Sequence, residues 1–292
     1  MVRRERNPQD HDAGLSAVRR VLLLFLFQAL AGCATNEITG RSQLLVVPES
    51  MAISSSASAY SSMMGDLGKK KQVESLDTER TKKVHEITNR LIAQAIRFRP
   101  DSANWKWEVQ VINDPKTVNA FCMAGGKMAI YTGLLEQLKP TDDEVAQVMG
   151  HEIAHALANH TQERMSIAMT SQVGLELAAL ALGGRQGGDL GLTGAQLAAV
   201  YAIQLPNSRE SESEADRIGI ELAARAGYDP KSAVTLWEKM EKAGGKGPPQ
   251  FLSTHPSPQN RRQRLAELGP QMEPFYQEAK ARPAANAPSF LH

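Results

Sequence analysis

One stretch of the chain decides its architecture: Thr141-Asp-Asp-Glu-Val-Ala-Gln-Val-Met-Gly-His-Glu-Ile-Ala-His155. Thr141 and Glu144 have the spacing of a capping box, and apolar residues follow at helical spacing. The pattern therefore predicts a helix over about residues 141–160. His151 and His155 are four residues apart, so they share one face of this helix. Two imidazoles placed in this way can bind one ion, and zinc accepts neutral imidazole nitrogen readily.

Glu152 follows the first histidine and lies about 100° around the helix from it. It can therefore flank the metal without binding it and take a proton from metal-activated water. From the His and Glu frequencies of this chain, an HExxH motif arises by chance in about one in a hundred such sequences. The alternative is a surface helix with two unrelated histidines. The capped amphipathic helix and a second, acidic motif downstream favour the metal site.

A zinc site needs a third protein ligand and an open position for water. The candidates lie in Ser208-Arg-Glu-Ser-Glu-Ser-Glu-Ala-Asp216. Glu212 and Asp216 share one helical face, which suits a metal ligand and a carboxylate that accepts the N–H of a metal-binding histidine. On spacing alone Glu212 is favoured only weakly over Glu214. A solvated acidic face of the helix is the alternative.

The rest of the chain predicts an α+β protein that is predominantly helical. Helical or strand periodicity and turn signals give the elements. Helices are expected near 48–67, 76–97, 208–226 and 231–243, with a short one after Pro258, and strands near 105–112, 118–123 and 127–131. The last two strands form a hairpin around Gly125-Gly126, and 127–131 is expected to present an open edge. Residues 165–206 predict a helical hairpin, which is either a mobile lid or part of the core.

The N-terminus reads as a targeting segment. Arg19 and Arg20 precede the apolar run 21–27, and Leu30-Ala-Gly-Cys33 follows. A basic flank, a short apolar run and small residues before a cleavage point are typical of a signal peptide. The quartet resembles the bacterial lipobox, which implies lipidation of Cys33, and Ala34 after it resembles the outer-membrane sorting pattern. An uncleaved signal anchor or a chance match is the alternative.

Composition excludes several classes. The chain has 292 residues, a formal net charge of +1 and two cysteines. A near-neutral balance gives no electrostatic affinity for nucleic acid, so no nucleic-acid partner is expected. If Cys33 carries a lipid, Cys122 has no partner, and the fold is not a disulfide framework. Its stability must then come from packing and from a bound metal.

HExxH followed, after a helical insert, by Ser208-Arg209…Glu212…Glu214-Ala215-Asp216…Gly219 resembles the M48 family of zinc peptidases. The resemblance implies a zincin-like (gluzincin) fold with a small antiparallel sheet beside the HExxH helix. It implies one Zn²⁺ per chain on His151, His155 and Glu212, with Glu152 as catalytic base and Asp216 behind the ligands. The segment 119–135 is similar to the family's strand pair before the zinc helix, although Ala124 replaces the usual proline.

His255, in Ser253-Thr-His255-Pro256, matches a THP motif of soluble family members. The implied roles are a fourth ligand that occludes the site or a donor to the oxyanion of the transition state. The alternative is a histidine that positions the following turn. His160 and His85 are expected to be structural or solvent-facing.

The resemblance is to lipid-anchored periplasmic members without a tetratricopeptide array. It implies a zinc-dependent metalloendopeptidase of the bacterial outer membrane, on its periplasmic face, that degrades unfolded or misfolded envelope proteins. The alternative is a chaperone or assembly factor with a latent or closed zinc site. The expected organisation is a signal peptide over 1–32, a lipid anchor and leader over 33–47, a peptidase domain over 48–268 and a flexible tail over 269–292.

Overall fold

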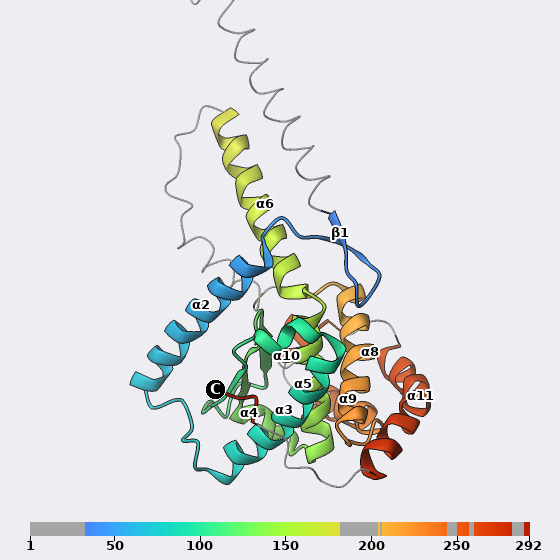
Figure 1. Ribbon diagram of the computed structural model, residues 1–292. Helices are drawn as coiled ribbons and strands as arrows, with labels where there is room; N and C mark the ends of the chain where they lie inside the picture. The colour runs from blue at the N-terminus through green and yellow to red at the C-terminus, as the bar shows by residue number, and fades with distance from the viewer. Residues whose placement is uncertain (1–32, 182–203, 205, 244–249, 257–259, 282–288) are drawn as a thin grey trace, which may run out of the picture.

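The computed structural model describes residues 33–181, 204, 206–243, 250–256, 260–281 and 289–292, and Figure 1 shows their arrangement. The predicted signal peptide lies outside the described residues. The described chain is predominantly helical with small sheets, as predicted. Its elements are β1 (Cys33–Thr35), β2 (Ser42–Leu44), α2 (Glu49–Lys69), α3 (Glu79–Phe98), η1 (Pro100–Asn104), β3 (Glu108–Ile112), β4 (Ala120–Met123), β5 (Lys127–Tyr131), α4 (Thr132–Leu138), α5 (Asp142–Leu157), α6 (His160–Ala181), α8 (Arg209–Arg225), α9 (Ser232–Ala243), α10 (Gln250–Thr254) and α11 (Arg261–Ala281).

Helix α5 lies at the centre of the molecule and packs against α8, α3, α9 and β4. Its start is fixed by the predicted capping box: the Thr141 side chain accepts from the Glu144 N–H, and the Glu144 carboxylate accepts from the Thr141 N–H. From Glu144 to Leu157 every residue of α5 is buried. A helix that is buried all round belongs to the core of its domain.

Helices α5 and α8 cross at two glycines. A Cβ on Gly219 would lie 2.8 Å from the Cα of His151, and a Cβ on Gly150 would lie 2.8 Å from the Gly219 carbonyl oxygen. The backbones therefore approach more closely than any side chain permits. This contact brings the acidic motif of α8 up to the histidines of α5.

The central sheet has the strand order β3-β5-β4. The hairpin of β4 and β5 is antiparallel, as predicted, and turns at Gly125 and Gly126, whose φ angles are +79° and +78°. Strand β3 joins β5 in parallel, so the sheet is mixed. The chain passes from β3 across the sheet to β4 and then returns in the middle. The prediction that 127–131 presents an open edge is therefore wrong: β5 is central, and β4 is the edge strand nearest α5.

Strand β4 is buried on both faces. Ala120 and Cys122 belong to the main core with α3 and α5, whereas Phe121 and Met123 belong to a second cluster under α2. This alternation follows from the two-residue period of a strand. The hydroxyl of Tyr60 on α2 donates to the Met128 carbonyl at 2.8 Å and fixes α2 on the sheet.

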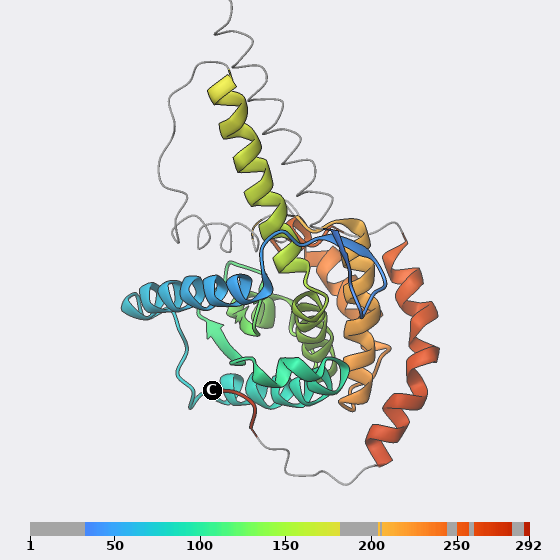
Figure 2. The same cartoon turned by 45° about the horizontal axis from the view of Figure 1, so that its top comes forward.

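Helix α6 begins directly after α5 and rises from the body beside β1, as Figures 1 and 2 show. It forms the first half of the hairpin predicted over 165–206. Residues 182–203 and 205 lie outside the described residues, so the hairpin stays a prediction. In the described part of the chain, no helix combines the length and the apolar run that a bilayer crossing requires.

Helix α11 differs from the expected short helix and flexible tail, because it continues through Pro270 and Pro274 to Ala281. Its own residues Leu265 and Met272 are buried, and the guanidinium of Arg225 on α8 lies 3.6 Å from the centre of the Phe275 ring. Prolines weaken a helix by removing hydrogen bonds. Packing against α8 and α9 offsets that loss, which composition alone could not reveal.

Residues 33–47 form a small hairpin, β1–β2, that lies against the C-terminal end of α5. The side-chain amides of Asn36 and Gln43 both donate to the Ala158 carbonyl at 2.9 Å. Residues beyond the predicted anchor were expected to form an extended leader. The leader is instead folded onto the helix that carries the histidines.

Candidate metal centre

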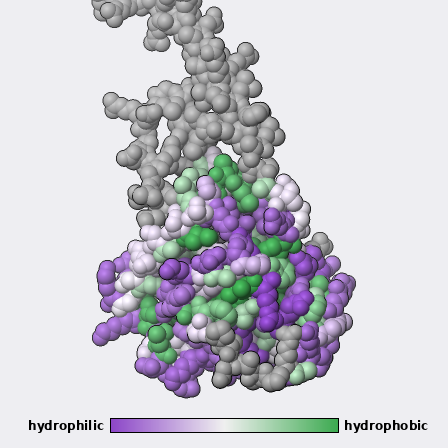
Figure 3. Space-filling view, viewed as in Figure 1, coloured by the Kyte–Doolittle hydropathy of each residue, from purple (hydrophilic) through white to green (hydrophobic). Residues whose placement is uncertain are grey.

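Three elements bring four candidate ligands together. His151 and His155 project from α5, Glu212 comes from the first turn of α8, and His255 follows α10. One ligand atom from each residue lies within 4.8 Å of those of the other three. All four residues are buried, and Glu212 is 0% exposed. The face of the molecule in Figure 3 mixes hydrophilic and hydrophobic residues.

The donor atoms have the spacing of a tetrahedral zinc site. The Nε2 atoms of His151 and His155 are 3.1 Å apart, and each lies 3.3 Å from a carboxylate oxygen of Glu212. Nδ1 of His255 lies 3.2 Å from His151 Nε2 and 3.0 Å from Glu212 Oε1. Zinc–ligand bonds of about 2.0–2.1 Å in a tetrahedron place donor atoms about 3.3 Å apart. Nitrogen and carboxylate donors at these separations fit zinc.

The protonation of two of the ligands suits a metal. Burial lowers the pKa of His155 well below its usual value, which favours the neutral imidazole that binds metals. Burial by itself would raise the pKa of Glu212, but the nearby His255 and His151 hold it well below its usual value. Glu212 is therefore a carboxylate, as ligation requires. The third, His151, differs: burial by itself would lower its pKa, but the carboxylates of Glu212 and Asp216 raise it to about 9, so a metal bound there must displace a proton.

Glu152 lies beside the cluster without entering it. Its Oε1 atom is 3.5 Å from Nε2 of His255 and has no hydrogen-bond partner among the described residues. A buried carboxylate oxygen without a partner is unusual and marks a place for a water or a substrate proton. Burial raises the pKa of Glu152, which makes the carboxylate a better proton acceptor.

Asp216 holds the far side of the first histidine. Its Oδ1 atom lies 3.1 Å from Nδ1 of His151, so the ring can donate there while Nε2 faces the cluster. Arg261, at the start of α11, donates to Asp216 at 2.5 Å and to Glu212 at 3.1 Å, and it lies over the Trp237 ring. The sequence did not point to Arg261, because nothing near it in the chain marks its contact with α8.

Glu214 and His160 occupy a second layer on the other side of the site. Spacing alone separated Glu212 from Glu214 only weakly, but the structure directs Glu214 to His160, at 2.8 Å. His160 is 1% exposed, and its Nδ1 atom lies 2.8 Å from Nδ1 of His155. His160 was expected to be structural or solvent-facing. Its position only five residues after His155 was the one sequence signal that the two rings could meet. His85 is half-buried and bonded to the Val109 carbonyl, away from the cluster.

The two cysteines lie apart from the metal cluster. Cys33 is exposed at the start of β1, and Cys122 is a free, buried thiol on β4. Burial raises the pKa of Cys122 well above its usual value, so the thiol stays protonated. Neither residue belongs to the cluster of candidate ligands.

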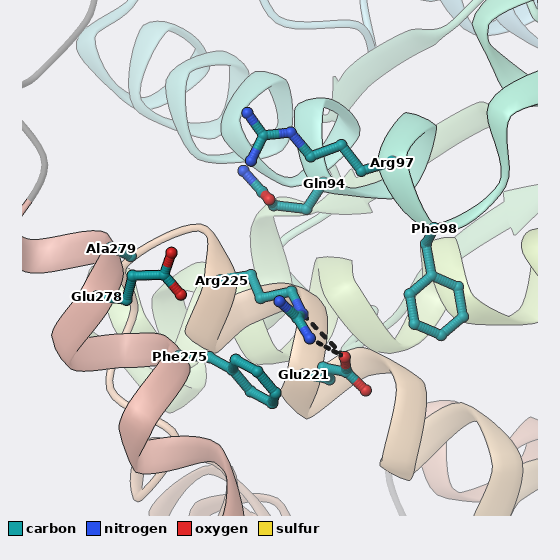
Figure 4. Close-up of a pocket in the computed structure, with 8 residues that line it drawn as sticks. All are labelled: Gln94, Arg97, Phe98, Glu221, Arg225, Phe275, Glu278 and Ala279. Carbon is teal, nitrogen blue, oxygen red and sulfur yellow. Dashed lines mark hydrogen bonds and ion pairs between the residues drawn. The ribbon is translucent and has the colours of Figure 1, made fainter.

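A separate hollow lies between α3, α8 and α11 (Figure 4). Its charged groups are partly satisfied within it, since Arg225 donates to Glu221 at 2.8 Å and stacks over Phe275. The lining residues that the structure describes include none of the candidate ligands.

Comparison with known proteins identifies relatives. The profile of peptidase family M48 matches residues 78–268. Mitochondrial metalloendopeptidase OMA1 of Arabidopsis thaliana is 42% identical over 177 residues, which are 60% of this chain and 34% of that protein. The mitochondrial metalloendopeptidase OMA1 of Bos taurus is 31% identical over 267 residues, 88% of this chain and 49% of that protein. The Beta-barrel assembly-enhancing protease of Escherichia coli strain K12 is 31% identical over 202 residues, 67% of this chain and 40% of that protein. In each case the chain covers half or less of the relative.

These comparisons overturn the prediction of a bacterial outer-membrane location. The relatives from Arabidopsis thaliana, Bos taurus and Homo sapiens are named as mitochondrial, and the plant protein is more similar to this chain than the Escherichia coli protease is. The prediction rested on Leu30-Ala-Gly-Cys33 and Ala34, five residues that carry too little information to fix a membrane. The family itself is settled by the match over 78–268, which contains both candidate metal-binding motifs: the chain belongs to peptidase family M48, a family of zinc-dependent peptidases.

Proposed function

We propose that the chain is a zinc-dependent metalloendopeptidase, with His151, His155 and Glu212 as zinc ligands and Glu152 as general base. The convergence of the three donors from α5 and α8, with separations of 3.1–3.3 Å, carries the proposal. A zinc ion held there supplies Lewis acidity that activates water and polarises the scissile carbonyl.

The other catalytic roles, proton transfer and the positioning of the ligands, fall to protein side chains. Glu152 accepts a proton from the attacking water and delivers it to the leaving amine; its Oε1 atom has no hydrogen-bond partner among the described residues. Asp216 and Arg261 hold the His151 ring and the Glu212 carboxylate in place. These two ligands are then held before substrate arrives, which lowers the reorganisation needed in the transition state.

The proposed substrates are unfolded or misfolded polypeptides. Support comes from the relatives' names, which include metalloendopeptidases and a protease that enhances β-barrel assembly. An extended peptide can add to the free edge of a sheet through backbone hydrogen bonds. The edge strand nearest α5 is β4, so β4 takes the role first expected of 127–131. A folded protein has no free strand to offer.

The decisive experiment combines zinc analysis with casein proteolysis on the full chain. Glu152→Gln is expected to retain stoichiometric zinc and to lose proteolysis by at least about 100-fold, because the base is gone. Glu212→Ala is expected to lose the metal. Glu210→Ala is the matched control, since Glu210 is an exposed acid on the same turn of α8. Full zinc occupancy in Glu212→Ala, or full activity in Glu152→Gln, contradicts the assignment.

A chaperone or assembly factor with a closed zinc site is the second candidate. The observation that favours it is the position of His255. Its Nδ1 atom lies close enough to the other donor atoms to serve as a fourth ligand of the same ion. His255→Ala separates the two. If His255 closes the site, the variant gains activity and loses some zinc affinity. If His255 instead donates to the oxyanion, the variant keeps zinc and loses activity. Tight binding of unfolded clients without cleavage by the wild type favours the chaperone.

We also propose that Cys33 carries a lipid that attaches the protein to a membrane. The support is the lipobox resemblance and the exposure of Cys33 at the start of β1. Cys33→Ser is expected to move the protein from the membrane fraction to the soluble fraction. A variant that stays fully membrane-bound rules the lipid out as the anchor.

A further inference from the structure

A series of hydrogen-bonded side chains leads away from His155 on the side opposite the other candidate ligands. The series runs from His155 through His160 and Glu214 to Arg41 in the leader. We propose that His160, Glu214 and Arg41 are positioning residues, which fix the tautomer and orientation of His155 for zinc binding. This inference rests on the proposed function, because it requires His155 to be a ligand.

The tautomers along this series follow from one another. Nε2 of His155 faces the other donors, so its only proton must lie on Nδ1 when the ring binds a metal. That Nδ1–H points at Nδ1 of His160, 2.8 Å away, which must then be unprotonated and accept. The proton of His160 therefore lies on Nε2 and is donated to Glu214 Oε2, at 2.8 Å. Each step permits one assignment, and the set ends on a carboxylate, the strongest acceptor available.

Arg41 fixes the last member of the series. Its Nε atom donates to both Glu214 oxygens, at 2.9 and 3.1 Å, and its two terminal nitrogens donate to Glu163, at 2.8 and 2.7 Å. The guanidinium thus bridges two carboxylates in the planar geometry that lysine cannot reproduce. The three side chains are 24%, 16% and 15% exposed, so solvent screens them only in part. Removal of Arg41 would leave two carboxylates close together without a cation.

The leader supplies Arg41 in a fixed place. Asn36 and Gln43 flank Arg41 in the β1–β2 hairpin, and both donate to the Ala158 carbonyl just beyond the end of α5. Gln43 also donates to Glu163 at 3.1 Å. The series of hydrogen bonds is therefore continuous from the folded leader to His155. Residues that precede the family match at 78–268 take part in the proposed site.

A positioning role differs measurably from a purely structural one. Loss of a structural contact lowers the stability of the metal-free and zinc-loaded protein alike and leaves zinc affinity unchanged. Loss of a group that orients a metal-binding histidine typically lowers metal affinity by about 10–100-fold. Cobalt(II) can replace zinc in such sites, and its visible spectrum reports on the ligand geometry directly.

The experiment measures zinc affinity by chelator competition, the cobalt(II) spectrum and metal-free unfolding on the full chain. His160→Leu and Arg41→Ala are expected to lower zinc affinity by about 10–100-fold and about 10-fold, with altered cobalt spectra. Glu214→Gln keeps an acceptor oxygen but loses the charge, so it is expected to lower affinity by less than His160→Leu does. Arg41→Lys is expected to recover only part of the loss.

Arg99→Ala is the matched control. Arg99 is also a part-buried arginine at the end of α5, where it donates to the Leu157 carbonyl and to Asn159 and pairs with Glu49 and Asp101. It is expected to lower stability without changing zinc affinity or the cobalt spectrum, because no bond leads from it to the histidines.

The outcomes separate the two proposals. The positioning role is overturned if folded His160→Leu and Arg41→Ala bind zinc within twofold of the wild-type affinity and give the wild-type cobalt spectrum. Zinc loss in Glu212→Ala would still support the metal site in that case. If His160→Leu does not fold, Arg41→Ala decides, since Arg41 lies three hydrogen bonds away from His155. A wild type that binds no zinc overturns both proposals.

Discussion

The two ends of α5 are held in opposite ways. At the N-terminal end, Thr141 and Glu144 cap the helix from within its own sequence. At the C-terminal end, the last carbonyls are bound by side chains from far away: Asn36 and Gln43 reach Ala158, and Arg99 reaches Leu157. These contacts span 58 to 122 residues of chain.

This difference has a functional side. The locally capped end forms as soon as the helix does, whereas the other end needs a folded leader. His155 and the hydrogen-bonded series that leads away from it lie at the end that depends on the leader. The half of the helix that is fixed from a distance is therefore the half that presents His155, a proposed zinc ligand.

The largest effect of a substitution on stability is expected at the centre of α5, where it crosses α8. Gly219→Ala is expected to destabilise the protein by about 3 kcal/mol and to impair zinc binding. The reason is that the new Cβ would lie 2.8 Å from the backbone of His151, where no flexible side chain can give way. Chemical denaturation and chelator competition measure the two effects.

Gly65→Ala is the control for that substitution. Gly65 is exposed in α2, and a Cβ there would meet nothing within 4 Å. The variant is expected to gain about 0.4–1 kcal/mol, because alanine restricts the unfolded chain. Equal stability of the two variants would mean that the crossing of α5 and α8 is looser than described.

The second-largest loss of stability is expected at the C-terminal end of α5, which is held by side chains from distant parts of the sequence. Gln43→Ala is expected to cost about 2 kcal/mol, because it removes a donor to the buried Ala158 carbonyl and one to Glu163. Urea unfolding gives the free energy, and hydrogen exchange at the end of α5 shows where protection is lost. Loss of protection at the start of α5 instead would contradict the separation of the two ends.

A smaller loss of stability is expected at the N-terminal cap of α5. Thr141→Ala removes the acceptor for the Glu144 N–H and is expected to cost about 1 kcal/mol. Zinc affinity is expected to stay at the wild-type value, since the cap lies at the end remote from His155. Unfolding and chelator competition on the same preparation test both halves, and a weakened metal site would erase the contrast between the ends.

The smallest effect is a change in acid sensitivity. Burial would raise the pKa of Glu144, but hydrogen bonds from Lys239, Thr141 and Thr235 lower it below the usual 4.5. A group with a lowered pKa in the folded state contributes stability at higher pH and loses it as pH falls through the folded pKa. The stability difference between wild type and Glu144→Gln is therefore expected to shrink below pH 4.5. Melting temperatures measured from pH 6 to pH 3 show it; a constant difference contradicts it.

The sequence predicted those parts of the fold that are encoded locally. The capping box at Thr141 and Glu144 and the turn at Gly125 and Gly126 both appear where expected. Helix α8 begins after Ser208 and ends before Gly227, whose φ of +83° suits glycine. Helical spacing also indicated that His151 and His155 share a face, because i and i+4 positions do so in any helix.

The sequence could not predict what depends on contacts between distant segments. The parallel pairing of β3 with β5 follows from a crossover, and periodicity is the same for edge and central strands. Arg261 and Arg41 lie 45 and 173 residues from the acids they bind, with no local signal. The prolines of α11 predicted a frayed tail, because the apolar surface of α8 that supports the helix is not visible in its own sequence.

The folded leader also limits how the protein can be trimmed for assay or crystallisation. A recombinant version starting at Pro48 retains everything that family similarity would mark as necessary, yet it lacks Asn36, Arg41 and Gln43 at once. The Ala158 carbonyl then loses both amide donors, and Glu163 and Glu214 lose their shared cation. Such a fragment would give a false impression of a weak metal binder. Expression should begin at Ala34, which removes Cys33 and the residues before it but keeps the folded leader.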